Sequence, residues 1–389
     1  MLAALRYRTP LGWRQLSAKP LRLCVALAGV MFANVLMFMQ LGVLTALIET
    51  SVMLQQRLTG DIVLSSATGR QLINIGTVPR RRAMQALAVP GVADATEVYS
   101  GMIEWINPAT GKASQLMVLG VDPQARVFAI PEIEAQRHKL MLTNTAILDR
   151  RSRGDWAGIV SAVEGRGTFP TEISGRQVHI EGLFSMGAAF ASDGTLIVSR
   201  ETFLAFVGTR SAGAVSFVLV TVEPGADAAA VARRIAATLP EADAKVETMA
   251  EFIATHRKFL AKDSPISFIF TMGALVGLVV GAGIVYQILS GDVNEHLAEY
   301  ATLKALGYSH GHLLSVVFEQ SLILAILGYV PSVIVAALLF KSISVATFLP
   351  IALTGDRMLL VFALTFGMCA ASGALATLRL RAADPADVF

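Results

Sequence analysis

The stretch that decides the fold is residues 264–291, which read SPISFIFTMGALVGLVVGAGIVYQILSG. None of these residues is charged. A helix needs roughly 20 apolar residues to cross a bilayer, and a single segment in lipid must satisfy its own backbone hydrogen bonds. The stretch therefore predicts a transmembrane helix, and we predict its bounds as 264–290.

Three further stretches predict the same structure, at residues 25–48, 313–340 and 358–378. The composition agrees, because 54% of the 389 residues are hydrophobic and only 16% are charged. Soluble domains carry about a quarter charged residues. The net charge of +3 argues against a nucleic-acid partner, which calls for a clearly basic surface. We therefore predict an α-helical membrane protein with four transmembrane helices.

The first predicted span could be mistaken for a signal peptide. Its apolar run is longer than the roughly 7–15 residues of such a signal. The residues that follow, Ala46-Leu47-Ile48-Glu49, give no small-x-small cleavage site. We interpret this span as retained in the membrane.

Basic residues near the spans predict the orientation, because cytoplasmic flanks carry an excess of Lys and Arg. Five basic side chains precede the first span without an acid among them, and Arg379 and Arg381 follow the last. We expect a bacterial inner-membrane protein with both termini in the cytoplasm. The expected parts are an interfacial segment 1–24, a periplasmic domain 49–263, a cytoplasmic loop 291–312, a periplasmic loop 341–357 and a cytoplasmic tail 379–389.

The large segment 49–263 has a mixed α+β pattern and as many acidic as basic side chains. Strand and helix signals alternate as βαββ, then an insertion, then βαβ, which indicates a split ferredoxin-like sandwich. We predict a porter-like part over 49–123 and 214–263. Residues 124–213 are rich in glycine and turn signals, and we predict an inserted β-rich subdomain there, with strands at 177–184 and 195–199.

The sequence carries no catalytic motif that we can identify. Gly111-Lys112 lacks the upstream glycine and the following Ser or Thr of a P-loop. Neither a nucleophile elbow nor a zinc-protease motif is present. Cys24 and Cys369 both lie in apolar runs, without ligand spacing. We expect no enzyme, no catalytic residue, no metal and no cofactor bound by this chain.

Two polar motifs leave alternatives open. His310-Gly311-His312 is either a metal pair or two polar residues in a surface loop, and the absence of a third nearby ligand favours the loop. Arg80-Arg81-Arg82 is either a grip for a phosphate or lipid headgroup or a solvated helix face. We favour the solvated face.

Glycines recur at intervals of four in the second span, at Gly273, Gly277 and Gly281. Glycine is common in membrane helices, but glycines stacked on one face let another helix approach closely. We interpret the three as a packing face, which a homodimer could use.

The loop between the second and third spans is the sharpest feature. Residues 292–308 begin as a charged, helix-prone stretch, which Gly307 ends as a C-cap would. Such a short amphipathic helix can lie on the membrane or in a partner's groove. The candidate contact residues are Glu299, Tyr300, Leu303, Lys304, Leu306, Gly307 and Tyr308. Glu319, just before the third span, either orients this helix or is simply exposed at the interface.

The segment Glu299-Tyr300-Ala301-Thr302-Leu303-Lys304-Ala305-Leu306-Gly307-Tyr308 resembles the coupling-helix signature of the FtsX/MacB-like ABC permeases, the type VII transporters. Glu319 and Asp384-Pro385-Ala386 resemble further marks of this group. Within it, residues similar to the DevC family are 11–16, 25–30 and 37–42, then Leu183-Phe184, Gly187, Phe190 and 193–197. The resemblance covers essentially the whole chain.

This resemblance implies a homodimeric permease that two separate ATPase subunits (DevA-like) drive, with ATP and Mg²⁺ bound on those partners. It also implies a periplasmic membrane-fusion adaptor (DevB/HlyD-like) and a TolC-like outer-membrane channel. The periplasmic domain would be MacB-like, and the exported cargo would be a glycolipid, another lipid or another amphiphile.

The expected mechanism is mechanotransmission, in which ATP-driven movement of the partners pushes the loop helix and changes the shape of the periplasmic domain. Two alternatives stay open. One is an FtsX-like signalling permease, which controls a periplasmic or membrane partner without moving cargo. The other is a lipid-active membrane enzyme, with Arg80-Arg81-Arg82 on a headgroup.

Overall fold

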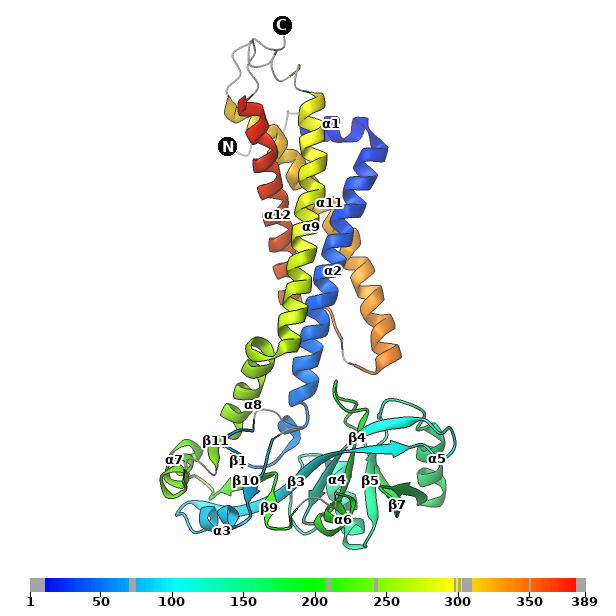
Figure 1. Ribbon diagram of the computed structural model, residues 1–389, viewed down its shortest axis with the longest axis vertical. Coiled ribbons are helices and arrows are strands. Elements are labelled where there is room, and N and C mark those ends of the chain that lie inside the picture. The colour runs from blue at the N-terminus through cyan, green and yellow to red at the C-terminus, as the bar shows by residue number, and fades with distance from the viewer. Residues whose placement is uncertain are drawn as a thin grey trace. The chain divides into compact units, whose positions relative to one another are not determined.

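The computed structural model describes residues 11–69, 75–207, 211–240, 244–296, 299, 302, 310–349 and 351–382. It divides into two compact units, which we describe separately (Figure 1). The helical unit contains the chain up to Thr45, then Pro265–Ser344, then the chain from Ile351. The sheet domain contains Ala46–Ser264 and Val345–Pro350.

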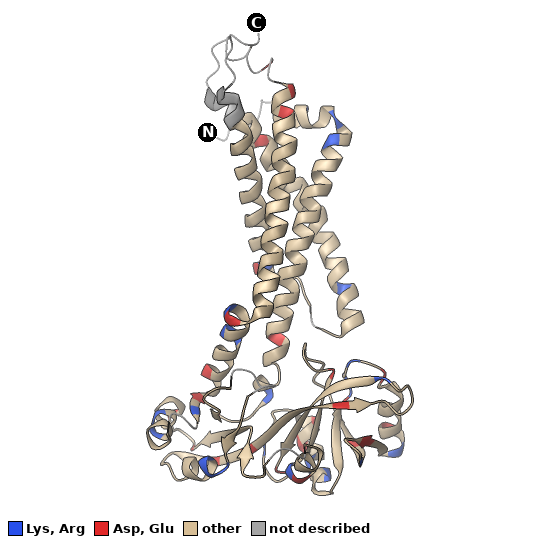
Figure 2. Cartoon of the chain, viewed as in Figure 1, with Lys and Arg blue, Asp and Glu red and all other residues tan. Residues whose placement is uncertain are grey.

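The part of the helical unit that the structure describes has four helices long and apolar enough to span a membrane, as predicted. They are α2 (Pro20–Val52), α9 (Pro265–Glu295), α11 (His310–Thr347) and α12 (Gly355–Ala382), preceded by the short α1 (Leu11–Ala18). Figure 2 shows that the charged residues of these helices lie toward the helix ends. Lipid imposes this pattern, because a charge at the bilayer centre costs several kcal/mol.

Apolar residues of α2, α9, α11 and α12 form the core of this unit, among them Val30, Val285 and Leu324. Buried polar side chains also link these helices, as they do between α2, α11 and α12. Asn34 Nδ2 on α2 donates to Ser332 Oγ on α11 at 3.3 Å, and Thr365 Oγ1 on α12 donates to Asn34 Oδ1 at 2.6 Å. All three are uncharged, so they join helices without the cost of an ion in lipid.

The sheet domain is built on one nine-stranded sheet of order β11-β1-β10-β3-β4-β8-β5-β7-β6. Its strands are β1 (Ile62–Ser65), β3 (Val92–Ile106), β4 (Ala113–Val121), β5 (Thr145–Asp149), β6 (Phe169–Ile173), β7 (Arg176–Phe184), β8 (Gly194–Ser199), β10 (Phe217–Val222) and β11 (Lys245–Thr248). Its helices are α3 (Arg81–Leu87), α4 (Pro131–Gln136), α5 (Ala157–Arg166), α6 (Arg200–Phe206), α7 (Ala228–Thr238) and α8 (Met249–Lys258). A two-stranded ribbon pairs β2 (Val78–Pro79) with β9 (Ala214–Val215).

Both faces of this sheet are covered, and the strands alternate between two cores. In β1, Ile62 and Leu64 belong to one buried cluster and Val63 to the other. Helices α3 and α7 contribute to the first cluster, whereas α4 and α8 contribute to the second. Successive side chains of a strand point to opposite faces, which explains the split.

The first four strands of the sheet order, β11-β1-β10-β3, are antiparallel throughout. With α3 joining β1 to β3, and α7 joining β10 to β11, they form the ferredoxin-like arrangement that the sequence predicts. The remaining strands form the inserted part.

The structure differs from the expected division at β3 and β4. Residues 92–98 of β3 pair with β10, but residues 99–106 pair with β4, which in turn pairs with β8. The strand β4, which we expected in the porter-like part, therefore lies in the sheet of the insertion. A single long strand is shared by both halves, and no linker separates them.

The inserted part is of mixed direction. β4 and β8 are parallel, as are β5 and β7, whereas β5 and β8 are antiparallel. The predicted strands 177–184 and 195–199 correspond to β7 and β8. Strands β5 and β6 were not predicted, and each has five residues.

Candidate coupling site

Most of the predicted loop residues lie outside the described part of the chain. These are Tyr300, Leu303, Lys304, Leu306, Gly307 and Tyr308. Glu299 is described and exposed. The residues at both ends of the loop are described, however, and they show how the loop is held.

A buried polar cluster lies where α9 ends and α11 begins, and we call Gln15, Asp292 and Gln320 the loop cluster. Gln320 Nε2 donates to Asp292 Oδ2 at 2.7 Å and to Gln15 Oε1 at 3.0 Å. Asp292 is 4% exposed and Gln320 is fully buried. A hydrogen bond to a buried carboxylate is stronger than one between neutral groups, so the cluster fixes α1 against the two ends of the loop.

Charged contacts surround the loop cluster on its exposed side. Lys19 and Arg22, at the start of α2, both pair with Glu295 at the end of α9, with 2.8 Å between Arg22 Nη1 and Glu295 Oε2. His296 Nδ1 lies 3.6 Å from Asp292 Oδ1. Exposed ion pairs contribute about 0–1 kcal/mol each. These ion pairs therefore add little stability to the buried hydrogen bonds that they surround.

The three glycines of α9 face other helices of the same chain. A Cβ on Gly273 would lie 2.6 Å from the Gln40 side chain, and one on Gly281 would lie 2.6 Å from Ala33 Cβ. One on Gly277 would contact Leu36 and the Ala33 carbonyl at 3.3–3.5 Å. These three glycines let α9 pack close to α2.

Glu319 is half-buried in α11, beside the loop cluster. Its Oε1 is buried and has no hydrogen-bond partner within the described ranges. The side chains of His310 and His312 lie outside what is described. Among the described residues, no group of three or more His, Cys, Asp or Glu could hold a metal ion.

The sheet domain carries a second set of polar contacts where its first and last helical segments meet, and we call Glu49, Gln55, His256 and Arg257 the stem joint. Arg257 Nη2 donates to Glu49 Oε2 at 2.9 Å. Gln55 Nε2 lies 2.5 Å from His256 Nδ1. These contacts join the end of α2 to α8.

Burial sets the protonation of the stem joint. His256 is 5% exposed, and desolvation lowers its pKa from 6.5 to about 4. At neutral pH the imidazole is therefore uncharged, so Nδ1 can accept the hydrogen bond of the Gln55 amide. Gln55 Oε1 is buried and has no hydrogen-bond partner in the described part of the chain.

Two more features adjoin the stem joint. After α8 the chain forms one π-helical segment, Phe259–Asp263, and such segments are frequent at functional positions. Elsewhere in the sheet domain, Arg153 Nε donates to the carbonyl of Thr347 at 3.1 Å. The connection between α11 and α12 is thereby attached to the sheet domain.

The solvated-face interpretation of Arg80-Arg81-Arg82 is wrong for Arg82. This residue is 5% exposed, and its Nη1 donates to Gln85 Oε1 at 2.5 Å. Arg80 is exposed but pairs with Glu97 Oε1 at 2.7 Å. Arg80 and Arg82 thus have partners inside the domain.

Sequence reasoning missed the loop cluster and the stem joint because their members are distant in the chain. Gln15 and Gln320 are 305 positions apart, and Gln55 and His256 are 201 apart. One signal was present, since Asp292 is the first charge after a long uncharged span and Gln320 opens the next uncharged run.

No curated protein matches the chain. Among solved structures, the periplasmic region of MacB from Actinobacillus actinomycetemcomitans is 12% identical, with a TM-score of 0.34, over 50% of this chain and 91% of that one. The extracellular domain of the noncanonic ABC-type transporter YknZ from Gram-positive bacteria is 12% identical, with a TM-score of 0.31, over 49% and 99%.

A family model covers the other part of the chain. Residues 271–385, which include α11, α12 and most of α9, match the FtsX-like permease C-terminal model. The match spans the loop cluster residues Asp292 and Gln320 together with the loop between them. Residues 271–385 therefore form a region similar to the C-terminal domain of FtsX-like permeases.

Proposed function

We propose that this chain is the membrane subunit of an ATP-driven exporter, and that it transmits movement of partner ATPases across the inner membrane to the sheet domain. The observation that carries the proposal is the pairing of α2 with α9. Polar contacts tie the start of α2 to the end of α9, and the glycines of α9 bring the two helices close. The end of α2 is tied to α8, which leads into α9.

In this mechanism the loop between α9 and α11 receives the push of the ATPase. The loop cluster passes it to α1, α9 and α11 together, because Gln320 bonds to Asp292 and Gln15 at once. The helix pair α2–α9 then displaces the stem joint, and the sheet domain changes shape. Conformational coupling of this kind needs a structural element with two arrangements, and both sites must shift the equilibrium between them. We assign that role to the α2–α9 pair.

The sparse polar content of the spans supports movement of cargo outside the helices. Among the described residues, the buried contacts Asn34–Ser332–Thr365 and Ser372–Ala282 lie within the spans, and neither has an ionisable group. A polar pathway needs more intramembrane polar groups than this. We propose that an amphiphile, such as a glycolipid or another lipid, enters from the periplasm or outer leaflet. It would leave through an adaptor and a TolC-like channel, as the DevC resemblance implies.

The proposed assembly has two copies of this chain, two ATPase subunits and an adaptor, with both termini in the cytoplasm. Gentle purification from membranes, followed by mass spectrometry, tests it. We expect a P-loop ATPase and a periplasmic adaptor to co-purify. An ATPase recovered with a cell-wall hydrolase or a sensor kinase would favour the signalling alternative, and the absence of an ATPase from stable complexes would exclude a transporter.

Two substitutions test the coupling directly. Gly307→Pro and Glu299→Arg are expected to leave membrane insertion intact but to separate ATP hydrolysis from transport. The matched control is Glu223→Arg, which makes the same charge change at an exposed position of the sheet domain. Normal transport by both loop variants would show that the loop is not where the ATPase acts.

A further inference from the structure

An uncharged loop joins β7 to β8 in the sheet domain. Its residues 185–192 read SMGAAFAS, and we call them the Phe190 loop. Phe190 is 38% exposed, and Ala191 beside it is exposed too. A single exposed apolar side chain is ordinary on a protein surface. The position of the loop therefore decides what its phenylalanine can do.

Buried and half-buried carboxylates hold the start of the Phe190 loop in one shape. Asp149 is fully buried, and it accepts the backbone N–H of Met186 at 3.1 Å and that of Gly187 at 2.6 Å. Glu132 Oε2 accepts the backbone N–H of Ser185 at 2.6 Å. Gly187 has a φ of 114°, which favours glycine. The loop is thus a built feature of the domain.

Two independent contacts place the Phe190 loop at the ends of membrane-spanning helices. Arg153 Nη2 donates to the carbonyl of Ala189 at 2.9 Å, and its Nε donates to the carbonyl of Thr347 at 3.1 Å. Thr347 is the last residue of α11. A Cβ on Gly187 would lie 4.0 Å from Met53 Cε, and Met53 directly follows α2.

The sequence of α11 sets the depth of this place. Lys341 is exposed, and it is the first charge after the uncharged run 320–340. A lysine near the end of a span extends its ammonium to the headgroups, so its backbone lies at the edge of the hydrocarbon core. At about 1.5 Å per residue, Thr347 lies about 9 Å further along the helix. The headgroup region is about 5–7 Å thick on each side. Thr347 is therefore at the headgroup surface.

A second phenylalanine is exposed at the same place. Phe348 directly follows Thr347 and is 53% exposed, with a φ of 57° that is unfavourable for any residue except glycine. Phe190 likewise follows Ala189, so each ring comes directly after a carbonyl that Arg153 holds. Asp193 lies 3.5 Å from Arg153 and compensates its charge. The two rings thus lie beside a neutral polar contact.

We propose that the Phe190 loop, together with Phe348, binds the surface of the lipid bilayer at the end where α2 and α11 leave it. Both rings lie at the boundary between headgroups and acyl chains, where exposed apolar side chains gain from burial. Arg153 is a positioning residue, because it joins the loop to the end of α11. The inference rests on the helices spanning a membrane and does not depend on the chain being an exporter subunit.

Photolabelling of the unmodified full chain tests the proposal. The chain is reconstituted in phosphatidylcholine vesicles that contain a phospholipid with a diazirine on its acyl chain. After illumination, trypsin releases residues 177–200 as one peptide, because cleavage follows Arg176 and Arg200. We expect lipid adducts on this peptide, at residues 186–191.

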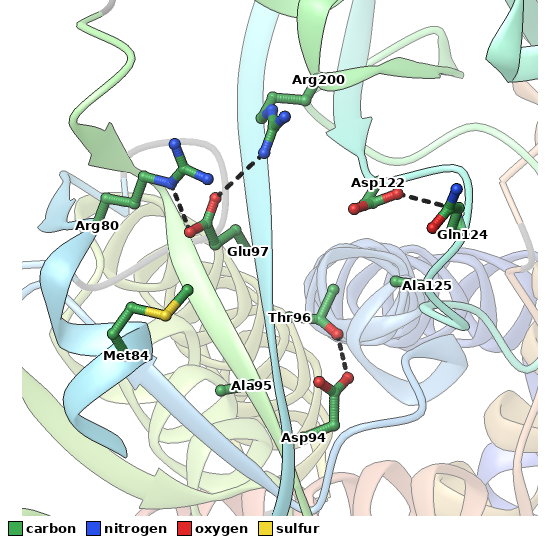
Figure 3. Close-up of a pocket in the computed structure, with 10 residues that line it drawn as sticks. All are labelled: Arg80, Met84, Asp94, Ala95, Thr96, Glu97, Asp122, Gln124, Ala125 and Arg200. Carbon is green, nitrogen blue, oxygen red and sulfur yellow. Dashed lines mark hydrogen bonds and ion pairs between the residues drawn. The ribbon is translucent and has the colours of Figure 1, made fainter. Parts of the chain in front are cut away.

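Met84 is the matched control, since it is exposed on α3 of the same domain. Figure 3 shows it beside a cavity of about 380 Å³ whose lining includes the charged Arg80, Asp94 and Glu97. Such a surface suits water, so the peptide 83–112 should carry no adduct at Met84. Phe190→Ser should lose most of the label on peptide 177–200, whereas Met84→Ser should keep it.

Two further measurements separate apolar contact from attraction of charge. Adding anionic phospholipid to the vesicles should leave the label unchanged, because Asp193 compensates Arg153. A nitroxide at Phe190→Cys, in a chain that carries Cys24→Ser, should collide more with oxygen than with a water-soluble nickel complex. The same label at Met84→Cys should show the reverse. Absence of adducts at 186–191, label that only anionic lipid brings about, or equal nickel access at the two positions would each overturn the proposal.

Discussion

The two ends of the α2–α9 pair are joined by different chemistry. The loop cluster consists of a carboxylate and two amides. Exposed ion pairs surround it, and Lys19 and Glu295 are about half-exposed. The stem joint uses a buried neutral pair, Gln55 and His256, beside the exposed pair Glu49–Arg257. Salt screens exposed ion pairs but hardly affects a buried neutral contact. Both ends therefore keep a buried contact that salt hardly affects, and the loop end has more exposed ion pairs that salt can weaken.

The close packing between the two ends gives the largest expected effect. In Gly281→Leu, the new side chain would start 2.6 Å from Ala33 Cβ and 2.9 Å from Met368 Sδ. Overpacking of this kind destabilises by about 3 kcal/mol, and it should separate α9 from α2. Thermal unfolding of the full chain in detergent measures the loss. The matched control is Gly283→Leu, since a Cβ on Gly283 meets nothing within 4 Å. Equal stability of the two variants would contradict the packing.

Acid should weaken the stem joint through His256. Its pKa is about 4 in the folded protein, against about 6.5 when unfolded. The unfolded chain therefore binds more protons in this window, so stability falls as the pH drops from about 6.5 to about 4. At pH 4.5 this loss amounts to about 2.5 kcal/mol.

The variant His256→Gln keeps a polar partner for Gln55 and cannot titrate. Comparing its thermal unfolding at pH 7 and pH 4.5 with that of the unmodified chain isolates the contribution of the imidazole. His138→Gln, at an exposed position, serves as the control and should retain the full pH dependence. If His256→Gln shows the same loss in acid as the unmodified chain, the neutral buried imidazole is not its source.

At the loop end, Gln320→Leu should cost about 1–2 kcal/mol of stability, because it leaves the buried Asp292 carboxylate without its donor. If the loop cluster transmits the movement of the ATPase, the rate of transport should fall more than the rate of ATP hydrolysis. Thermal unfolding and coupled transport assays measure the two effects. Asn294→Ala, at an exposed position near the end of α9, is the comparison variant. Equal transport by the two variants would show that the loop cluster takes no part in the coupling.

The exposed ion pairs should give the smallest effect. Glu49→Gln removes the partner of Arg257, which lies at an exposed position of the stem joint. The expected loss of stability is under about 1 kcal/mol, and added salt should reduce it further. A loss as large as that of Gly281→Leu would mean that the stem joint depends on its ion pair more than on the buried Gln55–His256 contact.

The sequence predicts well those structural elements that the lipid environment or a local residue pattern imposes. Residues 264–291 carry no charge over a length that crosses a bilayer, so α9 could be predicted from this stretch alone. The helices α3 and α7 and the strands around them could be predicted too, because each gives a local periodic signal. The sharing of β3 between two halves of the sheet could not, since no local pattern records which strand pairs with its second half.

The candidate site was harder to predict for the same reason. A loop motif is local, so residues 299–308 could be identified from their order. Asp292 and Gln320 meet only because α9 and α11 pack together, and Gln15 joins them from the opposite end of the chain. Contacts of this kind follow from packing, which a single sequence does not encode in its spacing.

The length of β3 has a mechanical consequence for the sheet domain. At about 3.3 Å per residue, its 15 residues extend for about 50 Å, and they belong to the ferredoxin-like half and the inserted half alike. A force that reaches β10 passes to β3 through their hydrogen-bonded ladder, and it then crosses to the insertion along the covalent chain of β3. Bending of this one strand would therefore displace both halves of the sheet together.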